Sequence, residues 1–69
     1  MISFKPLFDF MFDEKIAMQD LRKKTGLSSK TTAKFRKGES VSLSTVEKIC
    51  VAYRIPIEQV VEIKFDEID

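Results

Sequence analysis

The sequence predicts an all-α fold, a compact single domain of five short helices over residues 1–69. Apolar residues recur at helical spacing in several short segments. The two glycines and two prolines fall between those segments, where helices end or begin. A chain of 69 residues is near the lower limit for one apolar core without disulfides or metal, which favours compact helical packing. Alternating residues at both termini, 1–5 and 61–66, add the option of a short two-stranded β ribbon.

The first predicted helix covers about residues 6–14. Pro6 suits the first turn of a helix, and the apolar residues Leu7, Phe8, Met11 and Phe12 follow at helical spacing. Because so many aromatic residues fall in so short a segment, we expect this helix to anchor the core.

Two further helices are predicted on either side of a tight turn, within residues 18–38. The first, residues 18–25, ends at Gly26, since glycine suits the left-handed position after a helix. Leu27 can then tuck under the corner, and Ser28 offers a hydroxyl group to cap the next helix, residues 29–36. Gly38 ends that helix in the same way.

The fourth predicted helix carries an apolar stripe that runs from Leu43 to Tyr53. Both Ser42 and Ser44 are candidate caps, and Ser42 is preferred because it keeps Leu43 inside the helix. Pro56 should open a fifth helix that continues to about Val61. The alternation over residues 61–66 is then typical of a strand.

Charge is strongly segregated along the chain. Residues 15–37 contain eight basic residues and one acid, Asp20, for a net charge of +7. Residues 1–14 carry −2 and residues 38–69 carry −4, so the overall charge of +1 conceals a polarised molecule. A basic pair of helices within an acidic chain indicates a polyanionic partner.

Composition excludes several classes of function. With one cysteine, Cys50, and no histidine, the chain has neither an internal disulfide nor an ordinary zinc site, and no cofactor or metal is expected. No paired acids or phosphate-binding loop organise chemistry, so an enzyme is the least favoured class. The N-terminus does not resemble a signal peptide, and no apolar run is long enough to span a bilayer, so no membrane association is expected. A reducing, cytoplasmic location is predicted.

The residues of the second predicted motif helix suit the major groove of DNA. Ser29, Thr31 and Ala33 keep the helix slim, while Lys30 and Lys34 lie one turn apart, so they share a face that can reach base edges. The N–H groups after Ser28 favour a phosphate, with Thr31 as a hydroxyl donor. Arg36 and Lys37 would bind phosphate beyond the helix. The alternative is that these lysines form an ordinary solvated face.

These features together resemble the Cro/C1-type helix–turn–helix family of small phage and bacterial regulators, over about residues 4–63. The resemblance rests on Leu21, the turn Thr25-Gly26-Leu27-Ser28, Phe35 and Gly38, followed by Val41-Ser42-Leu43 and Ile55-Pro56-Ile57-Glu58. It implies that Ser29, Lys30 and Lys34 contact bases. It also implies that Ser28, Thr31 and Lys37 contact phosphates.

Three residues depart from the family pattern. Arg22 stands where the family usually has a small alanine at the crossing of the motif helices, so its side chain must extend outward or the crossing must loosen. Met18 replaces a glutamine that often touches phosphate, and neighbouring Gln19 is the candidate substitute. Thr32 replaces a larger aliphatic residue that faces the core.

The sequence therefore predicts a sequence-specific transcriptional regulator, a repressor that binds promoter DNA as a homodimer, with no evident small-molecule effector. The apolar residues of the terminal ribbon would contribute to the dimer, although the same residues also fit an exposed, frayed tail. A second hypothesis is a protein-interaction module, such as an antitoxin or an adaptor. Steep weakening of binding with salt would distinguish DNA from a protein partner.

Overall fold

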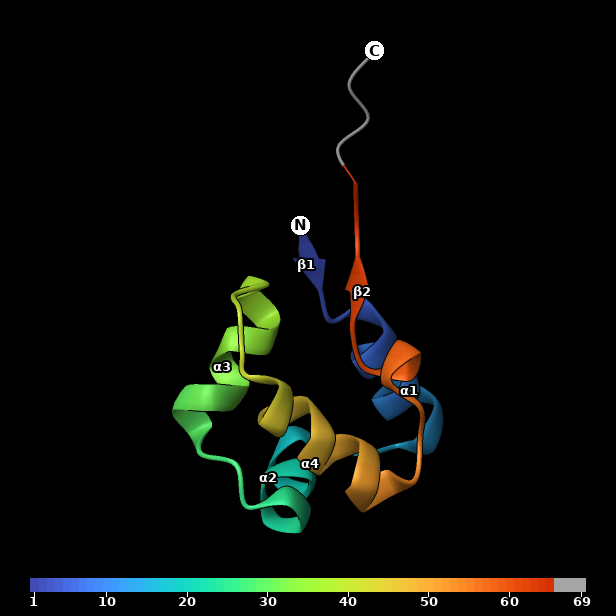
Figure 1. The fold of residues 1–69 in the computed structure, drawn as a ribbon. Helices are drawn as coiled ribbons and strands as arrows, with labels where there is room; N and C mark the ends of the chain where they lie inside the picture. The colour runs from blue at the N-terminus through green and yellow to red at the C-terminus, as the bar shows by residue number, and fades with distance from the viewer. Residues whose placement is uncertain (66–69) are drawn as a thin grey trace.

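The computed structural model describes residues 1–65 of the chain. Its elements in order are β1 (Ile2–Ser3), α1 (Lys5–Glu14), α2 (Met18–Thr25), α3 (Ser29–Lys37), α4 (Leu43–Tyr53), the 3-10 turn η1 (Ile57–Gln59) and β2 (Glu62–Ile63) (Figure 1). The predicted helical fold and terminal ribbon are both confirmed, and the bounds of the first four helices agree to within one residue. Among the described helices, none is long and apolar enough to cross a lipid bilayer.

The fifth helix was predicted too long. After Pro56 the chain makes only the three-residue turn η1, in which the amides of Val60 and Val61 both bond to the carbonyl oxygen of Ile57. Val60 is fully buried, and β2 begins two residues later at Glu62. The burial of Val60 and the start of β2 at Glu62 therefore leave only one turn between Pro56 and the strand.

The ribbon joins the two ends of the described chain in antiparallel pairing. Ile2 lies opposite Ile63 and Ser3 lies opposite Glu62, and the Ser3 hydroxyl donates to the Glu62 carboxylate at 3.0 Å. The strands are shorter than the predicted ranges of 1–5 and 61–66, because α1 already begins at Lys5. Residue 66 lies outside the described residues.

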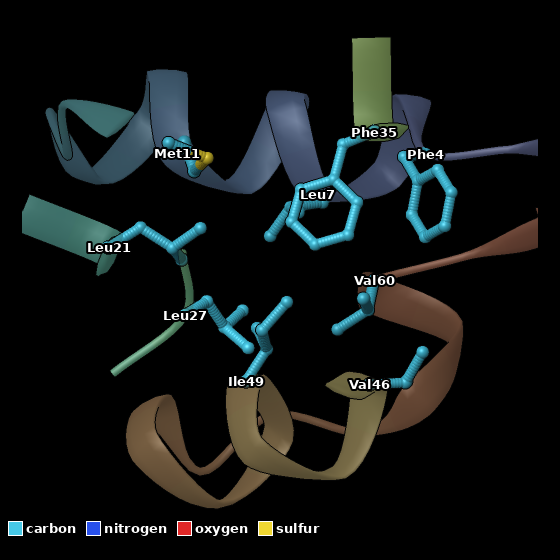
Figure 2. Packing of buried hydrophobic residues seen from close by; sticks show 9 residues of the cluster. All are labelled: Phe4, Leu7, Met11, Leu21, Leu27, Phe35, Val46, Ile49 and Val60. Atoms are coloured by element: carbon cyan, nitrogen blue, oxygen red, sulfur yellow. The ribbon is translucent and has the colours of Figure 1, made fainter. Parts of the chain in front are cut away.

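The core draws side chains from every helix and from the segments that flank η1 and β1. Figure 2 shows these side chains converging between α1, α2 and α4. Phe35 of α3 packs against Phe4 with ring centroids 4.8 Å apart and ring planes tilted by 44°, which fixes α3 against the start of α1. The buried apolar residues are Phe4, Leu7, Met11, Leu21, Leu27, Phe35, Val46, Ile49 and Val60.

Two apolar residues that periodicity assigned to buried stripes are exposed. Leu43, at the first position of α4, is 77% exposed, and Phe12 of α1 is 85% exposed. The stripe of α4 is buried only from Val46 onward, because no described element covers the first turn of this helix. Periodicity identifies the face of a helix, but it does not tell how far the neighbouring elements extend along it.

Candidate nucleic-acid interface

Helices α2 and α3 form a helix–turn–helix whose turn is built as the sequence predicted. Gly26 has a φ of 77°, in the left-handed region that favours glycine, and its amide bonds to the carbonyl oxygen of Arg22. Leu27 follows as a buried residue and holds the corner to the core. The path of the chain between the two helices is thereby set by one glycine and one buried leucine.

The start of α3 is capped by Ser28. The Thr31 amide donates to Ser28 Oγ at 3.1 Å, and the Ser28 hydroxyl donates to Thr31 Oγ1 at 3.1 Å. The Thr31 hydroxyl thus keeps its own proton for a further acceptor. The amides of Ser29 and Lys30 are the first two N–H groups of the helix, and they precede any intrahelical acceptor. This end of α3 offers several donors to a phosphate.

The buried side of α3 determines which residues it presents outward. Thr32 and Phe35 are buried, so the exposed face lies on the opposite side. Of the predicted base-reading residues, Ser29 and Lys30 are exposed, whereas Lys34 is half-buried at the edge of this face. The exposed residues of α3 are Ser29, Lys30, Ala33, Arg36 and Lys37.

The remaining predicted phosphate partners lie at the two ends of the motif. Gln19 is exposed in the first turn of α2, and Arg36 and Lys37 are exposed in the last turn of α3. Within residues 1–65 the one ion pair is between Lys5 and Asp9, at 2.8 Å. No carboxylate among the described residues therefore neutralises the cations of α3.

Arg22 contributes to this surface in a way that the sequence reasoning missed. Its guanidinium Nη1 lies 3.4 Å from Thr32 Oγ1, so the side chain crosses to α3 and is half-buried instead of extending away from the crossing. Thr32 Oγ1 also donates to the Ser29 carbonyl oxygen at 3.2 Å. The sequence did contain a signal for this contact, because Arg22 and Thr32 both depart from the family pattern at positions that face each other. A groove of about 370 Å³ follows this crossing and is lined by Met18, Arg22, Ser29, Thr32, Ala33 and Arg36.

One basic residue of the segment is directed elsewhere. The Lys24 ammonium lies 5.1 Å from the centre of the Tyr53 ring, at the end of α4. Burial raises the pKa of the Tyr53 hydroxyl, with a smaller contribution from Asp20, so the ring beneath Lys24 stays neutral at physiological pH. Lys24 therefore belongs to the packing of α2 on α4 and not to the exposed face of α3.

This combination of a glycine turn, a capped second helix and an unpaired cationic face defines a helix–turn–helix DNA-binding domain. Residues 7–66 match the family model described as the Cro/C1-type HTH DNA-binding domain, so the chain belongs to that family. Among solved structures, it is similar to form II of the transcriptional regulator VanUg, with a TM-score of 0.84 and 30% sequence identity. That similarity covers 88% of this chain and 81% of the other. No curated protein matches the chain.

Proposed function

We propose that this protein is a transcriptional repressor that binds promoter DNA as a homodimer, with α3 in the major groove. The observation that carries the proposal is the exposed face of α3, where slim residues alternate with lysines on a helix held rigidly by its buried side. A helix of this kind can approach base edges closely and still reach them with long donors. The transcriptional role is also that of the similar protein VanUg.

Within this proposal, the residues divide by their position on the motif. Ser29, Lys30 and Lys34 read bases, since they lie in the first two turns of α3. The residues at the ends of the motif position the protein on the phosphates, namely Gln19, Ser28, Thr31, Arg36 and Lys37. Ser28 acts mainly through the cap, because its hydroxyl already donates to Thr31.

The proposed homodimer is supported by an apolar groove of about 260 Å³ between the start of α4 and the ribbon. We assign this groove to a second copy of the chain, since Ile63 of β2 lines it and β2 pairs with no strand but β1 among residues 1–65. Three of its apolar side chains are exposed: Leu43 (77% exposed), Ile57 (49%) and Ile63 (58%). In a two-fold symmetric dimer, these side chains of one subunit can pack against the same groove of the other. Its lining is entirely apolar: Ile2, Phe4, Val41, Leu43, Val46, Ile57, Val61 and Ile63.

The test is a gel-shift or anisotropy titration on the DNA upstream of the protein's own gene, with random DNA as the competitor. Lys30→Ala and Lys34→Ala should reduce the preference for the promoter sequence, whereas Lys37→Ala should weaken binding to both DNAs alike. Lys48→Ala, an exposed lysine of α4, is the matched control. If the Lys30 and Lys34 variants keep the full preference, the assignment of the reading residues is wrong.

A further inference from the structure

A second groove, of about 330 Å³, lies between the terminal ribbon and the end of α3. One wall is formed by β1 and by Lys64, and the other wall is formed by Arg36, Lys37 and Gly38. In Figure 1, β1 lies between the end of α3 and β2. This groove therefore extends the exposed cationic face of α3 onto a different part of the fold.

The ribbon is held in place relative to α3 by close packing. A Cβ atom on Gly38 would lie 3.2 Å from the Ile2 carbonyl oxygen, so β1 passes directly over the helix end. The tilted packing of Phe4 against Phe35 fixes the next residues of the same segment. The backbone of β1 is thus held close to the end of α3.

The register of the ribbon directs Lys64 toward this groove. The Lys64 amide donates to the Met1 carbonyl oxygen at 2.8 Å, which continues the pairing of Ser3 with Glu62 and Ile2 with Ile63. Because side chains alternate along a strand, Lys64 lies on the opposite face from Ile63, which lines the apolar groove. The ribbon therefore presents an apolar face to one groove and a cationic side chain to the other.

The charges around the groove leave four cationic groups without an acidic partner among the described residues. Lys5 also lines it, but Lys5 bonds to Asp9 at 2.8 Å. The Glu62 carboxylate accepts from Ser3 Oγ at 3.0 Å. The Met1 α-ammonium, which donates to the Lys64 carbonyl oxygen at 2.7 Å, remains together with the side chains of Arg36, Lys37 and Lys64. These groups line the groove beside the rings of Phe4, Phe8 and Phe35.

We propose that this groove binds a phosphodiester group of the DNA strand that borders the major groove, and that Lys64 is a DNA-contacting residue. This inference rests on the proposed function. A helix of nine residues is about 13 Å long, and the major groove is about 12 Å wide. When the first turn of α3 contacts bases, its last turn reaches the bordering strand, and the ribbon packed on that turn reaches it too. The terminal ribbon is then part of the DNA-binding surface as well as part of the fold.

The test compares Lys64→Gln with Lys48→Gln, which removes the same charge from an exposed position on α4. The probe is a duplex selected by wild-type protein from a random pool, and binding is measured over a range of salt. Lys64→Gln should weaken binding about fivefold per subunit and make the slope of log K against log salt shallower by about 1.8 for a dimer, one phosphate contact in each subunit. Lys48→Gln should leave the affinity and the salt slope unchanged. Lys64→Arg keeps the positive charge, so it should bind with the affinity and salt slope of the wild type. When single phosphates of the duplex are replaced in turn by neutral methylphosphonates, at least one replacement should weaken the wild type but not Lys64→Gln.

The outcomes separate this inference from the proposed function. If wild-type protein binds the duplex but Lys64→Gln and Lys48→Gln behave alike, the role of Lys64 is wrong and the proposed function stands. If every methylphosphonate replacement weakens the wild type and Lys64→Gln alike, Lys64 does not contact a phosphate and the inference is overturned. If wild-type protein binds no DNA, both proposals are overturned.

Discussion

Arg22 of α2 and Thr32 of α3 face each other at the crossing of the motif helices, with Nη1 and Oγ1 separated by 3.4 Å. The threonine is 3% exposed, and its hydroxyl also donates to the Ser29 carbonyl oxygen. A long cationic side chain fits this crossing because its partner is short and can accept a hydrogen bond. The two departures from the family pattern therefore act as a pair, and they leave the buried hydroxyl fully satisfied.

A double-mutant cycle measures this pairing. We expect Arg22→Ala and Thr32→Val to be coupled by about 0.5 kcal/mol in the free energy of unfolding, since the contact is long and partly solvated. Lys23→Ala, at the neighbouring exposed position, should show no coupling to Thr32→Val. Urea denaturation of the four proteins gives the value, and strictly additive effects would show that the contact contributes nothing.

A comparison of a buried phenylalanine, Phe35, with an exposed one, Phe12, tests the packing of the core directly. Phe35→Ala removes a ring that is 2% exposed and packed against Phe4, and we expect it to cost about 3–5 kcal/mol in the free energy of unfolding. In so small a domain that loss approaches the total stability, so the variant should be largely unfolded at 37 °C. Phe12→Ala, which truncates a ring that is 85% exposed, should change the unfolding free energy by less than about 0.5 kcal/mol. Similar costs for the two variants would contradict the packing described above.

The glycines that end α2 and α3 should differ in their tolerance of alanine. Both have positive φ, 77° at Gly26 and 68° at Gly38, and alanine in this region costs about 1 kcal/mol. A Cβ at Gly26 meets nothing within 4 Å, whereas one at Gly38 meets the Ile2 carbonyl oxygen at 3.2 Å. Gly38→Ala should therefore be the more destabilising substitution, by about 1 kcal/mol. Thermal unfolding of the two variants tests this, and equal melting temperatures would show that β1 does not press on the end of α3.

The proposed dimer surface can be tested with two exposed apolar residues of the same helix. Leu43 borders the apolar groove, whereas Val51, 70% exposed, lies on another face of α4 near Lys24 and Lys48. Leu43→Glu should shift the protein toward monomer, because a symmetric contact would bring the two introduced charges together. Val51→Glu should have no effect. Sedimentation equilibrium decides the matter, and a wild-type protein that is monomeric at micromolar concentration, both free and on DNA, would refute the dimer.

Much of the fold was predictable because the signals are local. Ser28, Ser42, Gly26 and Gly38 act on their own helix ends, and the structure places each cap and turn where the sequence predicted it. The length of η1 and the exposure of Leu43 depend on how far distant segments reach, and no local pattern contains that information. The same distinction applies to the candidate site. The exposed residues of α3 followed from periodicity, but the contact of Arg22 with Thr32 and the approach of Lys64 to Arg36 and Lys37 arise only when the chain is folded.

The central claim is that the cationic face of α3 binds DNA through phosphates and selects sequence through bases. Its most direct test is an anisotropy titration of wild-type protein against promoter and random duplexes over a range of salt. Two cationic phosphate contacts per subunit, Arg36 and Lys37, predict that log K falls linearly with log salt with a slope of about −3.6 for a dimer. The proposed contact of Lys64 would steepen this slope to about −5.4. Binding should remain tighter to the promoter duplex at every salt concentration. A slope near zero, or equal affinity for the two duplexes throughout, would contradict the account.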